Sequence, residues 1–587
     1  MTKLDFQDVT IRYERRAGSS RKAADAVKHV SVSLAPGATL GIAGESGSGK
    51  STLAMSVLRL LPKNAKITGS ILLNGESITD MKWGRIRVVR WTEAAVVFQG
   101  AMHALNPVQR IHEQIEEALE LHAVGDRKEM QKPERRAARV TELLEMVDLP
   151  KSKGEAFPHH LSGGQKQRVM IAMALACEPD VIIADEPTTA LDVIVQDQIL
   201  QLLKRRVAER QLTLMMISHD LTVLATVCEE IAVMYRGELI EHGPSHEVLT
   251  NPQHPHTAKL AAAFPLIGDP TSRLALPTYT APDAPTADPD TPRPPLAPLV
   301  QEAEELVDVE TRKISLDDVV LAARDLTVEF GHGDAKHTAV DHVDLTCRPG
   351  EIIALVGQSG SGKTTLARTL LGLQAPTSGA VHYRGKPLSQ RQRELKKYRR
   401  RVQYVLQDPM AALNSRHTVY EQIAEGLRAQ GIRDDEHGRV ARALREAELD
   451  PPEEFFHAYP NELSGGQRQR VVIAGALALE PEFLIADEPV ASLDASVRAD
   501  VLSLFLRLRS ERGLGALVIT HDLGLAWNIA DRVAVMYQGK IVEHGPVEDV
   551  LLSPTHPYTK KLLAVVPSAE RESRILEETK GHHDHAR

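Results

Sequence analysis

The chain has 587 residues, of which 42% are hydrophobic and 25% are charged, a composition typical of a soluble globular protein with several domains. Its formal net charge of −9 at pH 7 gives no general electrostatic reason to expect nucleic-acid binding. No uninterrupted apolar run reaches the roughly 18 residues of a membrane span, the N-terminal sequence is not that of a signal peptide, and three scattered cysteines indicate neither a disulfide framework nor a zinc site.

A glycine-rich loop is the first motif in chain order. Residues 44–51 read GESGSGKS, follow a short apolar run and precede a helix-compatible one. A loop of the form G-x-x-x-x-G-K-[ST] turns backbone N–H groups towards an anion at a helix N-terminus. Lys50 would reach the β- and γ-phosphates of a nucleotide, and Ser51 would coordinate Mg²⁺. The predicted nucleotide contacts are Gly44, Glu45, Ser46, Gly47, Ser48, Gly49, Lys50, Ser51 and Thr52.

A glutamine and a helix-rich stretch follow. Gln99 ends the apolar run VVFQ, where it could ligate Mg²⁺ and connect the next segment to the nucleotide, although spacing alone leaves a plain strand end equally open. The segment 111–122, IHEQIEEALELH, has the helical spacing of a surface helix. We predict a helical subdomain over about residues 110–160, inserted into a nucleotide-binding core.

The motif LSGGQ begins the next helix-compatible run. Its residues Ser162, Gly163, Gly164 and Gln165 would expose N–H groups at a helix N-terminus, which can bind an anion. The motif lies too far along the chain to duplicate the phosphate loop of the same half. A site built across two copies resolves this, with the loop from one copy and the signature from the other.

Two carboxylates and a histidine follow buried strands. VIIADEP reads as a parallel strand that ends in Asp185 and Glu186, at the sheet edge where ligands collect. Asp185 would hold Mg²⁺ through its water shell, and Glu186 would orient and deprotonate the attacking water. His219 closes a later strand 33 positions after Glu186, where we expect it to contact the γ-phosphate and sense its presence.

A change of composition marks a linker. Ten prolines fall between Phe264 and Pro298, and the acidic run QEAEELVDVE follows. Proline disfavours both helix and sheet, so the segment is predicted to be a linker that lets its two neighbours face each other. The predicted domains are residues 1–264 and 319–567, with the linker at 265–318 and a C-terminal tail at 568–587.

Every motif occurs a second time after the linker. Glu186 follows Ser162 by 24 positions and Glu488 follows Ser464 by the same 24, and His521 again follows its glutamate by 33. Equal spacing indicates two copies of one α/β fold. The second set, with the same predicted roles, is Gly357, Gln358, Ser359, Gly360, Ser361, Gly362, Lys363, Thr364 and Thr365 in the loop, Gln407, then Ser464, Gly465, Gly466 and Gln467, then Asp487, Glu488 and His521.

Taken together, these motifs resemble those of the ATP-binding cassette (ABC) family over both halves. The set includes an LD loop at Leu191–Asp192 and again at Leu493–Asp494. The resemblance implies two tandem P-loop nucleotide-binding domains, each a RecA-like core with a β-subdomain and an inserted helical subdomain. It also implies a head-to-tail sandwich with two ATPs and Mg²⁺ at the interface, both sites competent for hydrolysis. Tyr13 and Phe330 stand where family members stack the adenine.

A narrower resemblance comes from the segments HPHT and HPYT late in each half, with ALNP after the first glutamine. These are similar to the oligopeptide/dipeptide importer ATPases, including tandem fusions. The resemblance implies an ATPase at the cytoplasmic face of the inner membrane, working with two integral-membrane permease subunits and an extracytoplasmic solute-binding protein. The permease helices would dock around Gln99 and Gln407. No cysteine follows Cys347, so we expect no iron–sulfur cluster of the kind that some relatives carry.

Alternatives remain open. Related importers move nickel, glutathione, opines or sugars, so peptide is the favoured solute among several. Tandem cassettes without membrane spans also act on ribosomes, but those have a long charged helical linker, unlike the proline-rich one here. The basic run RQRELKKYRRR at 391–401 is the one hint of RNA or anionic lipid, and a solvated helix face is the favoured interpretation, so we expect no nucleic-acid partner.

Overall fold

The computed structural model describes residues 3–14, 24–98, 100, 104–122, 132–189, 191–263, 267–268, 319–331, 336–491 and 493–566. Gln99, the C-terminal tail and the predicted linker, apart from residues 267 and 268, lie outside this described part. Within the described residues, no helix is both long and apolar enough to cross a membrane.

The first half contains two sheets and the helices around them. Its strands are β1 (Leu4–Tyr13), β2 (Ala24–Leu34), β3 (Thr39–Ala43), β4 (Ala65–Leu73), β5 (Glu76–Ser77), β6 (Ala94–Val97), β7 (Val181–Asp185), β8 (Thr213–Ile217), β9 (Glu230–Tyr235) and β10 (Glu238–Pro244). Its α-helices are α1 (Lys50–Ser56), α2 (Trp83–Thr92), α4 (Ile111–His122), α6 (Pro133–Met146), α7 (Gly163–Leu175), α8 (Val193–Arg210), α9 (Leu221–Val227), α10 (Ser245–Thr250) and α11 (Pro255–Ala262).

The second half repeats this order of elements. Its strands are β11 (Leu321–Phe330), β12 (His337–Cys347), β13 (Ile352–Val356), β14 (Ser378–Tyr383), β15 (Lys386–Pro387), β16 (Val402–Val405), β17 (Phe483–Asp487), β18 (Gly515–Thr520), β19 (Arg532–Tyr537) and β20 (Lys540–Pro546). Its α-helices are α13 (Lys363–Leu370), α14 (Gln392–Arg401), α15 (Pro409–Ala412), α16 (Val419–Gln430), α17 (Glu436–Glu446), α18 (Gly465–Leu477), α19 (Ala495–Arg512), α20 (Leu523–Ile529), α21 (Val547–Leu552) and α22 (Pro557–Ala564).

A six-stranded, mainly parallel sheet forms the core of each half. The strand order is β10-β9-β3-β8-β7-β6 in the first half, and the second half has the corresponding order read from the other edge, β16-β17-β18-β13-β19-β20. Strands β3, β7 and β8 are buried along their whole length, as expected of parallel strands covered by layers on both faces. The order places β8, which His219 follows, between β3, which precedes the phosphate loop, and β7, which ends in Asp185.

Each core sheet lies between two apolar layers. On one face, α1 and the antiparallel sheet β2-β1-β4-β5 enclose a core that includes Phe6, Leu53 and Ile183. On the other face, residues of the inserted helices pack with α7 and α8, including Ile115, Leu144 and Leu203. The second half has the same two cores. The predicted α/β class with an inserted helical subdomain is therefore confirmed.

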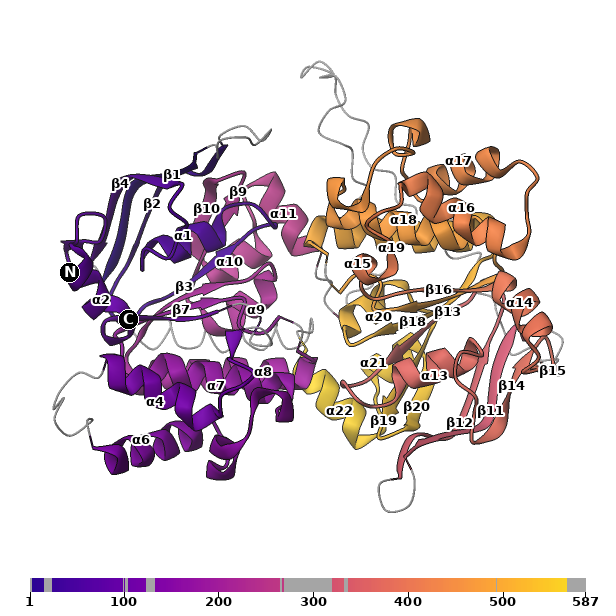
Figure 1. Ribbon diagram of the computed structural model, residues 1–587, viewed down its shortest axis with the longest axis horizontal. Coiled ribbons are helices and arrows are strands. Elements are labelled where there is room, and N and C mark those ends of the chain that lie inside the picture. The colour runs from indigo at the N-terminus through magenta and orange to yellow at the C-terminus, as the bar shows by residue number, and fades with distance from the viewer. Residues whose placement is uncertain are drawn as a thin grey trace, which may run out of the picture.

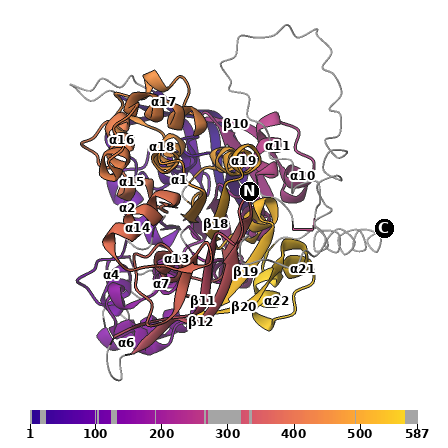
Figure 2. The same cartoon turned by 90° about the vertical axis from the view of Figure 1, so that its right-hand side faces the viewer.

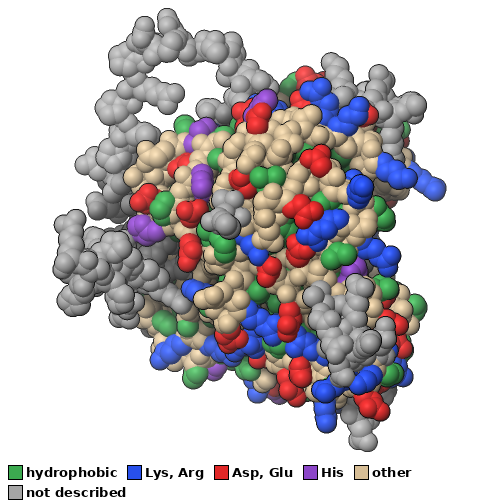
Figure 3. All heavy atoms as spheres, turned by 90° about the vertical axis from the view of Figure 1, so that its left-hand side faces the viewer, with side chains coloured by type: hydrophobic (Ala, Val, Ile, Leu, Met, Phe, Trp, Pro, Cys, Tyr) green, Lys and Arg blue, Asp and Glu red, His purple; other side chains and the backbone are tan. Residues whose placement is uncertain are grey.

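The two halves face each other in opposite orientations. In Figure 1 the helical subdomain of the first half (α4, α6) is at the bottom, whereas that of the second half (α16, α17) is at the top. Figure 2, turned by 90°, shows the same opposition. In this arrangement α11 of the first half packs on α19 of the second half. On the outer face of the first half, acidic and basic side chains are interspersed (Figure 3).

Candidate active sites at the facing phosphate loops

The two phosphate loops have the same geometry. Lys50 is buried, and its Nζ donates to the carbonyl oxygens of Gly44 and Glu45, both at 2.7 Å. Lys363 Nζ donates to Gly357 at 2.7 Å and to Gln358 at 2.8 Å. Burial lowers the pKa of both ammonium groups, against the opposing effect of neighbouring carboxylates. A buried positive charge held over a ring of backbone groups favours the entry of an anion.

Both the backbone conformation and the lack of room for a Cβ atom require glycine at two positions of the first loop. Gly49 has a φ of 103°, and a Cβ added there would lie 2.2 Å from the carbonyl oxygen of Ala26. Gly44 has a φ of 144°, and its Cβ would lie 2.2 Å from the carbonyl oxygen of Met234. The loop is thus clamped on the protein side by two backbone segments. At Gly47, whose φ is 78°, nothing lies within 4 Å of an added Cβ, so the loop is open on its other side.

The donor set of the loops fits a polyphosphate. Gly49 and Gly362 are the N-cap residues of α1 and α13, and neither helix has a side-chain cap, which leaves its first N–H groups for another acceptor. The hydroxyl of Ser361 is buried and has no hydrogen-bond partner within the described residues. These features match what the triphosphate of ATP supplies.

The predicted Mg²⁺ ligands lie next to the loops. Ser51 Oγ donates to Asp185 Oδ1 at 3.1 Å, and the Tyr404 hydroxyl donates to Asp487 Oδ2 at 3.0 Å. Burial raises the pKa of Asp185 and Asp487, and the adjacent glutamates add to the effect. No group of three or more metal-ligating side chains occurs among the residues described, so Mg²⁺ here would need phosphate oxygens to complete its shell, as it commonly does.

The predicted catalytic glutamates contact the predicted histidines. His219 Nδ1 lies 3.4 Å from Glu186 Oε1, and His521 Nδ1 lies 3.1 Å from Glu488 Oε1. Burial acts to raise the pKa of Glu186, but the hydrogen bond and charge of His219, with smaller effects of Thr189 and Lys50, lower it to about 2. Glu186 is therefore held as a carboxylate. Each histidine thus contacts a glutamate in this structure, and its predicted contact with the γ-phosphate stays a prediction.

Two further side chains complete the glutamate sites. Thr189 Oγ1 donates to Glu186 Oε2 at 2.8 Å, and Gln407 Nε2 donates to Glu488 Oε2 at 2.7 Å. Gln407, proposed from sequence as an Mg²⁺ ligand, is thus a partner of the glutamate here. Its counterpart Gln99 lies outside the described residues. Thr189 was not among the predicted residues, although its position three residues after the glutamate could have indicated it.

The signature residues make contacts within their own half. Ser162 and Gln165 form a capping box on α7: Gln165 N donates to Ser162 Oγ at 3.3 Å and Ser162 N donates to Gln165 Oε1 at 3.2 Å. Ser464 and Gln467 form the same box on α18. A Cβ on Gly164 would lie 2.3 Å from Val195 Cγ1, and one on Gly466 2.2 Å from Val497 Cγ1. The second glycine of each signature is therefore needed for packing, and a role of the motif in trans stays a prediction.

The LD loop supplies a hydrogen bond between the halves. Ser46 N in the first phosphate loop donates to Asp494 Oδ1 of the second half at 2.8 Å. The charge of Asp494 acts on Lys50 and that of Asp192 acts on Lys363, so each LD-loop aspartate lies near the opposite phosphate loop. The sequence marked these aspartates only as part of a motif, without a role.

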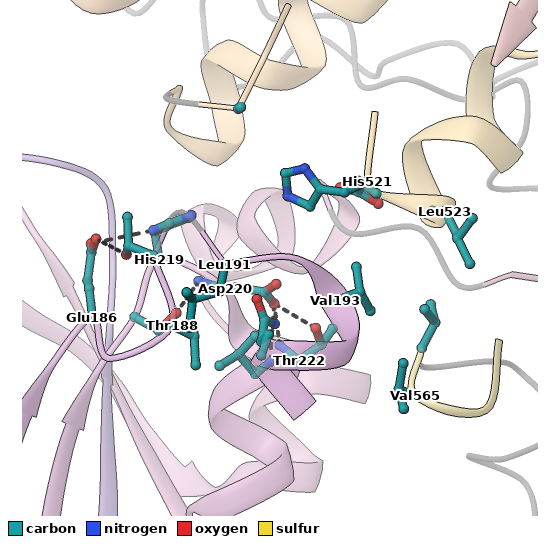
Figure 4. A pocket seen from close by; sticks show the side chains of 18 of the residues that line it. Glu186, Thr188, Leu191, Val193, His219, Asp220, Thr222, His521, Leu523 and Val565 are labelled. Carbon is teal, nitrogen blue, oxygen red and sulfur yellow. Dashed lines mark hydrogen bonds and ion pairs between the residues drawn. The ribbon is translucent and has the colours of Figure 1, made fainter. Parts of the chain in front are cut away.

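A pocket of about 170 Å³ lies between the halves. Figure 4 shows Glu186 and His219 on one side of it and His521 and Leu523 of the other half across from them. Val565, just beyond α22, also lines it. Both histidines thus line one shared pocket between the halves.

The predicted adenine-stacking residues have different surroundings. The Tyr13 hydroxyl lies 3.2 Å from Thr52 Oγ1, beside the start of α1. Phe330 ends β11 with 43% of its surface exposed. Only Tyr13 has a contact beside a phosphate loop, and the stacking role of both residues stays a prediction.

Two family models each match this chain twice, once in each half. The ABC transporter family model matches residues 27–189 and 340–491, and the model for the C-terminal region of oligopeptide/dipeptide transporters matches residues 240–289 and 542–586. The chain is 40% identical over 574 residues to the glutathione import ATP-binding protein GsiA of Escherichia coli strain K12, covering 94% of this chain and 88% of that protein. It is 39% identical over 575 residues to the protein of that name in Salmonella paratyphi A, covering 94% and 89%.

A solved structure is also similar to part of the chain. The dimeric ATP-binding cassette MJ0796, in a post-hydrolysis state bound to ADP and Pi, is 30% identical, with a TM-score of 0.36 over 39% of this chain and 98% of that chain.

Proposed function

The chain belongs to the ABC transporter family, and from that premise we propose that it is the ATP-hydrolysing subunit of a system that imports small peptides. It is an ATPase with two cassettes in one chain. The observation that carries the import proposal is the C-terminal region of the oligopeptide/dipeptide transporter type, which matches after each of the two cassettes.

We assign the chemistry of each site to the residues described above. Lys50 and Lys363 bind phosphate oxygens. Asp185 and Asp487, with the hydroxyls of Ser51 and Thr364, would hold Mg²⁺, which would neutralise charge on the phosphates. Glu186 and Glu488 orient the attacking water, and the His219 and His521 rings hold those carboxylates in place. The opposing signature, Ser464–Gln467 or Ser162–Gln165, closes each site in trans.

The proposed partners are two integral-membrane permease subunits and an extracytoplasmic solute-binding protein, with the chain at the cytoplasmic face of the membrane. A groove of about 450 Å³ in the first half supports a docking helix: its lining includes Leu60, Trp83 and Phe98, which directly precedes Gln99. Trp83 is 66% exposed and Phe98 40% exposed, and exposed apolar side chains gathered at one place indicate a partner.

The corresponding surface of the second half differs in chemistry. Leu373 and Leu406, the counterparts of Leu60 and Phe98, are also exposed. The helix beside them, α14, is strongly basic, with arginines in its last turn, whereas α2 presents Trp83 and Val88. Because the two surfaces differ, we propose that each half receives a different permease subunit, the second through a helix that carries acidic residues.

The proposed solute class is small peptides, and glutathione is the first one to test. Glutathione is a tripeptide, so the name of the GsiA relatives and the oligopeptide/dipeptide family description agree on this class. Nickel, opines and sugars are the alternatives within the same importer type.

Purification of the chain from detergent-solubilised native membranes tests the import proposal. We expect two permease-type subunits to copurify, and the complex in proteoliposomes with its binding protein to accumulate glutathione or another small peptide when ATP is supplied. The Glu186→Gln plus Glu488→Gln variant should keep the partners and lose uptake. Ribosomal proteins or rRNA in place of membrane subunits would overturn the import reading and leave a soluble two-site ATPase.

A further inference from the structure

The HP-[HY]-T segments form a repeated structure next to the phosphate loops. In the second half, Glu543 of β20 accepts from the backbone N–H groups of Thr555 and His556, at 2.6 and 3.2 Å. His556 then caps α22, with its Nδ1 accepting from Tyr558 N at 3.1 Å. In the first half, Glu241 and His254 make the equivalent bonds at the start of α11. The segment therefore fixes where the residue after the proline points.

In the second half that residue touches the phosphate loop. The backbone N–H of Gln358, the second residue of the loop, donates to the Tyr558 hydroxyl at 2.9 Å. The Tyr558 ring stacks on Tyr537 with centroids 4.1 Å apart, and only 7% of the residue is exposed. A buried ring stacked on a core strand is a rigid support, so the hydroxyl fixes the loop at this residue.

The opposite half also reaches this point. Burial is the main cause that raises the pKa of Tyr558, and the charge of Asp192 from the LD loop of the first half adds to it. Asp192 acts on Lys363 as well. The opposing LD-loop aspartate is therefore close enough for its charge to act on both Tyr558 and Lys363.

The first half has the same construction with different chemistry. His256 takes the place of Tyr558 and packs on Tyr235, with ring centroids 4.0 Å apart. Glu45 takes the place of Gln358, and its charge acts on the imidazole. The His256 Nε2 is buried without a hydrogen-bond partner among the residues that the structure describes. At this loop, Ser46 N is held by Asp494 from the other half.

We propose that Tyr558, the residue between the proline and the threonine of the second HP-[HY]-T segment, is a positioning residue for the phosphate loop of its own half. Its hydroxyl accepts a hydrogen bond from the backbone of that loop. His256 stands at the matching place in the first half, where its Nε2 has no hydrogen-bond partner among the described residues. The tyrosine therefore supports the second loop in a way that the histidine does not support the first, and the two ATP sites differ in this support.

The inference rests on the ATPase of the proposed function and not on import. Its test uses the purified full chain with Glu186→Gln plus Glu488→Gln, which should not hydrolyse ATP, and ATP is the probe. The result does not depend on permease subunits, so a failure of the import proposal would not affect this inference. Tyr558→Phe should weaken ATP binding at one of two sites roughly fivefold, because one neutral hydrogen bond is lost. Amide exchange at Gln358 should become faster. Tyr537→Phe, which keeps both rings, is the matched control and should change neither.

The first half has its own test. The double variant Glu45→Gln plus His256→Tyr recreates the second-half pair, so it should slow amide exchange at residue 45 and tighten ATP binding at that site roughly fivefold, because one hydrogen bond is gained. Unchanged exchange at residue 45 in this variant, or unaltered exchange at Gln358 in Tyr558→Phe, would overturn the proposal.

Discussion

At the scale of single residues, the two glutamates that we propose as catalytic have an unusual backbone. Glu186 and Glu488 have φ angles of 44° and 46°, a left-handed conformation that costs on the order of 1 kcal/mol or more outside glycine. The backbone N–H of Glu186 donates to Ile217 O at 3.0 Å, and that of Glu488 donates to Ile519 O at 2.9 Å. These bonds to the neighbouring strand hold the turn that directs each carboxylate at its histidine.

Replacing both glutamates should separate ATP binding from hydrolysis. In Glu186→Gln plus Glu488→Gln we expect hydrolysis to fall by roughly 10²-fold or more, since a general base is lost, while ATP still binds because the phosphate loops are unchanged. Phosphate release and equilibrium ATP binding measure the two effects. Glu178→Gln plus Glu480→Gln is the control, since those exposed glutamates also have positive φ angles, 54° and 53°. Equal losses in both pairs would contradict the assigned role.

At the scale of elements, both halves contain the same irregular strand pair. Asp8 in β1 and Asp325 in β11 have φ angles of 50° and 47°, at the points where the register of each strand shifts. Each aspartate contacts a histidine of the next strand, His29 at 2.8 Å and His342 at 2.6 Å. A bulge of this kind depends on side chains from separate strands, and nothing in the local sequence pattern of one strand predicts it.

A glycine facing this bulge offers a stability test. At Gly69, whose φ is 83°, an added Cβ would lie 2.3 Å from the carbonyl oxygen of Asp8, whereas at Gly75, whose φ is 81°, nothing lies within 4 Å. Gly75→Ala should cost about 1 kcal/mol for the left-handed backbone. Gly69→Ala should lower the free energy of unfolding by more than about 2 kcal/mol, because backbone must also move. Urea unfolding followed by Trp83 and Trp91 fluorescence compares them; equal costs would contradict the contact.

The bulge histidine should titrate above its usual range. The hydrogen bond with Asp325 is the main cause that raises the pKa of His342, and the charge of Asp325 adds to it. The charged imidazole is therefore bound more strongly in the folded state. The stability it contributes is present below its unfolded pKa of about 6.5 and is lost as the pH rises through the raised folded value. NMR titration should show the shift in the native chain, and Asp325→Asn should remove it.

At the scale of the whole molecule, the two LD-loop aspartates have different tasks. Asp192 caps its own helix, accepting from Val195 N at 3.1 Å. Asp494 makes no side-chain cap on α19 and bonds instead to Ser46 N of the opposite half. In the pocket between the halves, Arg498 donates to Asp522 of its own half at 3.0 Å, and Gln196 stands at the matching place in the first half. The two halves are thus similar in fold and unequal at their interface.

Alanine at each aspartate should reveal this inequality. Asp192→Ala should lower the stability of the first half by about 1 kcal/mol, the usual cost of a lost helix cap. Asp494→Ala should leave stability nearly unchanged and weaken the cooperativity between the two ATP sites, because a charge-assisted hydrogen bond worth roughly 1.5–3 kcal/mol is lost across the interface. Thermal unfolding and the ATP dependence of hydrolysis measure the two effects. Matching effects of the two variants would contradict the described asymmetry.

The sequence by itself determined the repeat, the fold class, the family and the order of the site residues. These depend on short motifs whose chemistry is local, such as a loop that needs glycines to close around phosphate and a buried strand that is followed by Asp185 and Glu186. They also depend on the equal spacing of these motifs in the two halves. Both halves could be predicted in the same way because the same local motifs occur in each.

Only the tertiary structure decided which of these residues meet. It brought His219 to Glu186, used Ser162 and Gln165 to cap a helix, extended Asp494 across the interface and placed Tyr558 on the phosphate loop 200 positions earlier in the chain. Each of these contacts joins backbone or side-chain groups whose separation is set by sheet order and by the packing of one half on the other. Motif spacing along one chain carries no information about such distances, because they are fixed only when the buried surfaces of the elements are packed together.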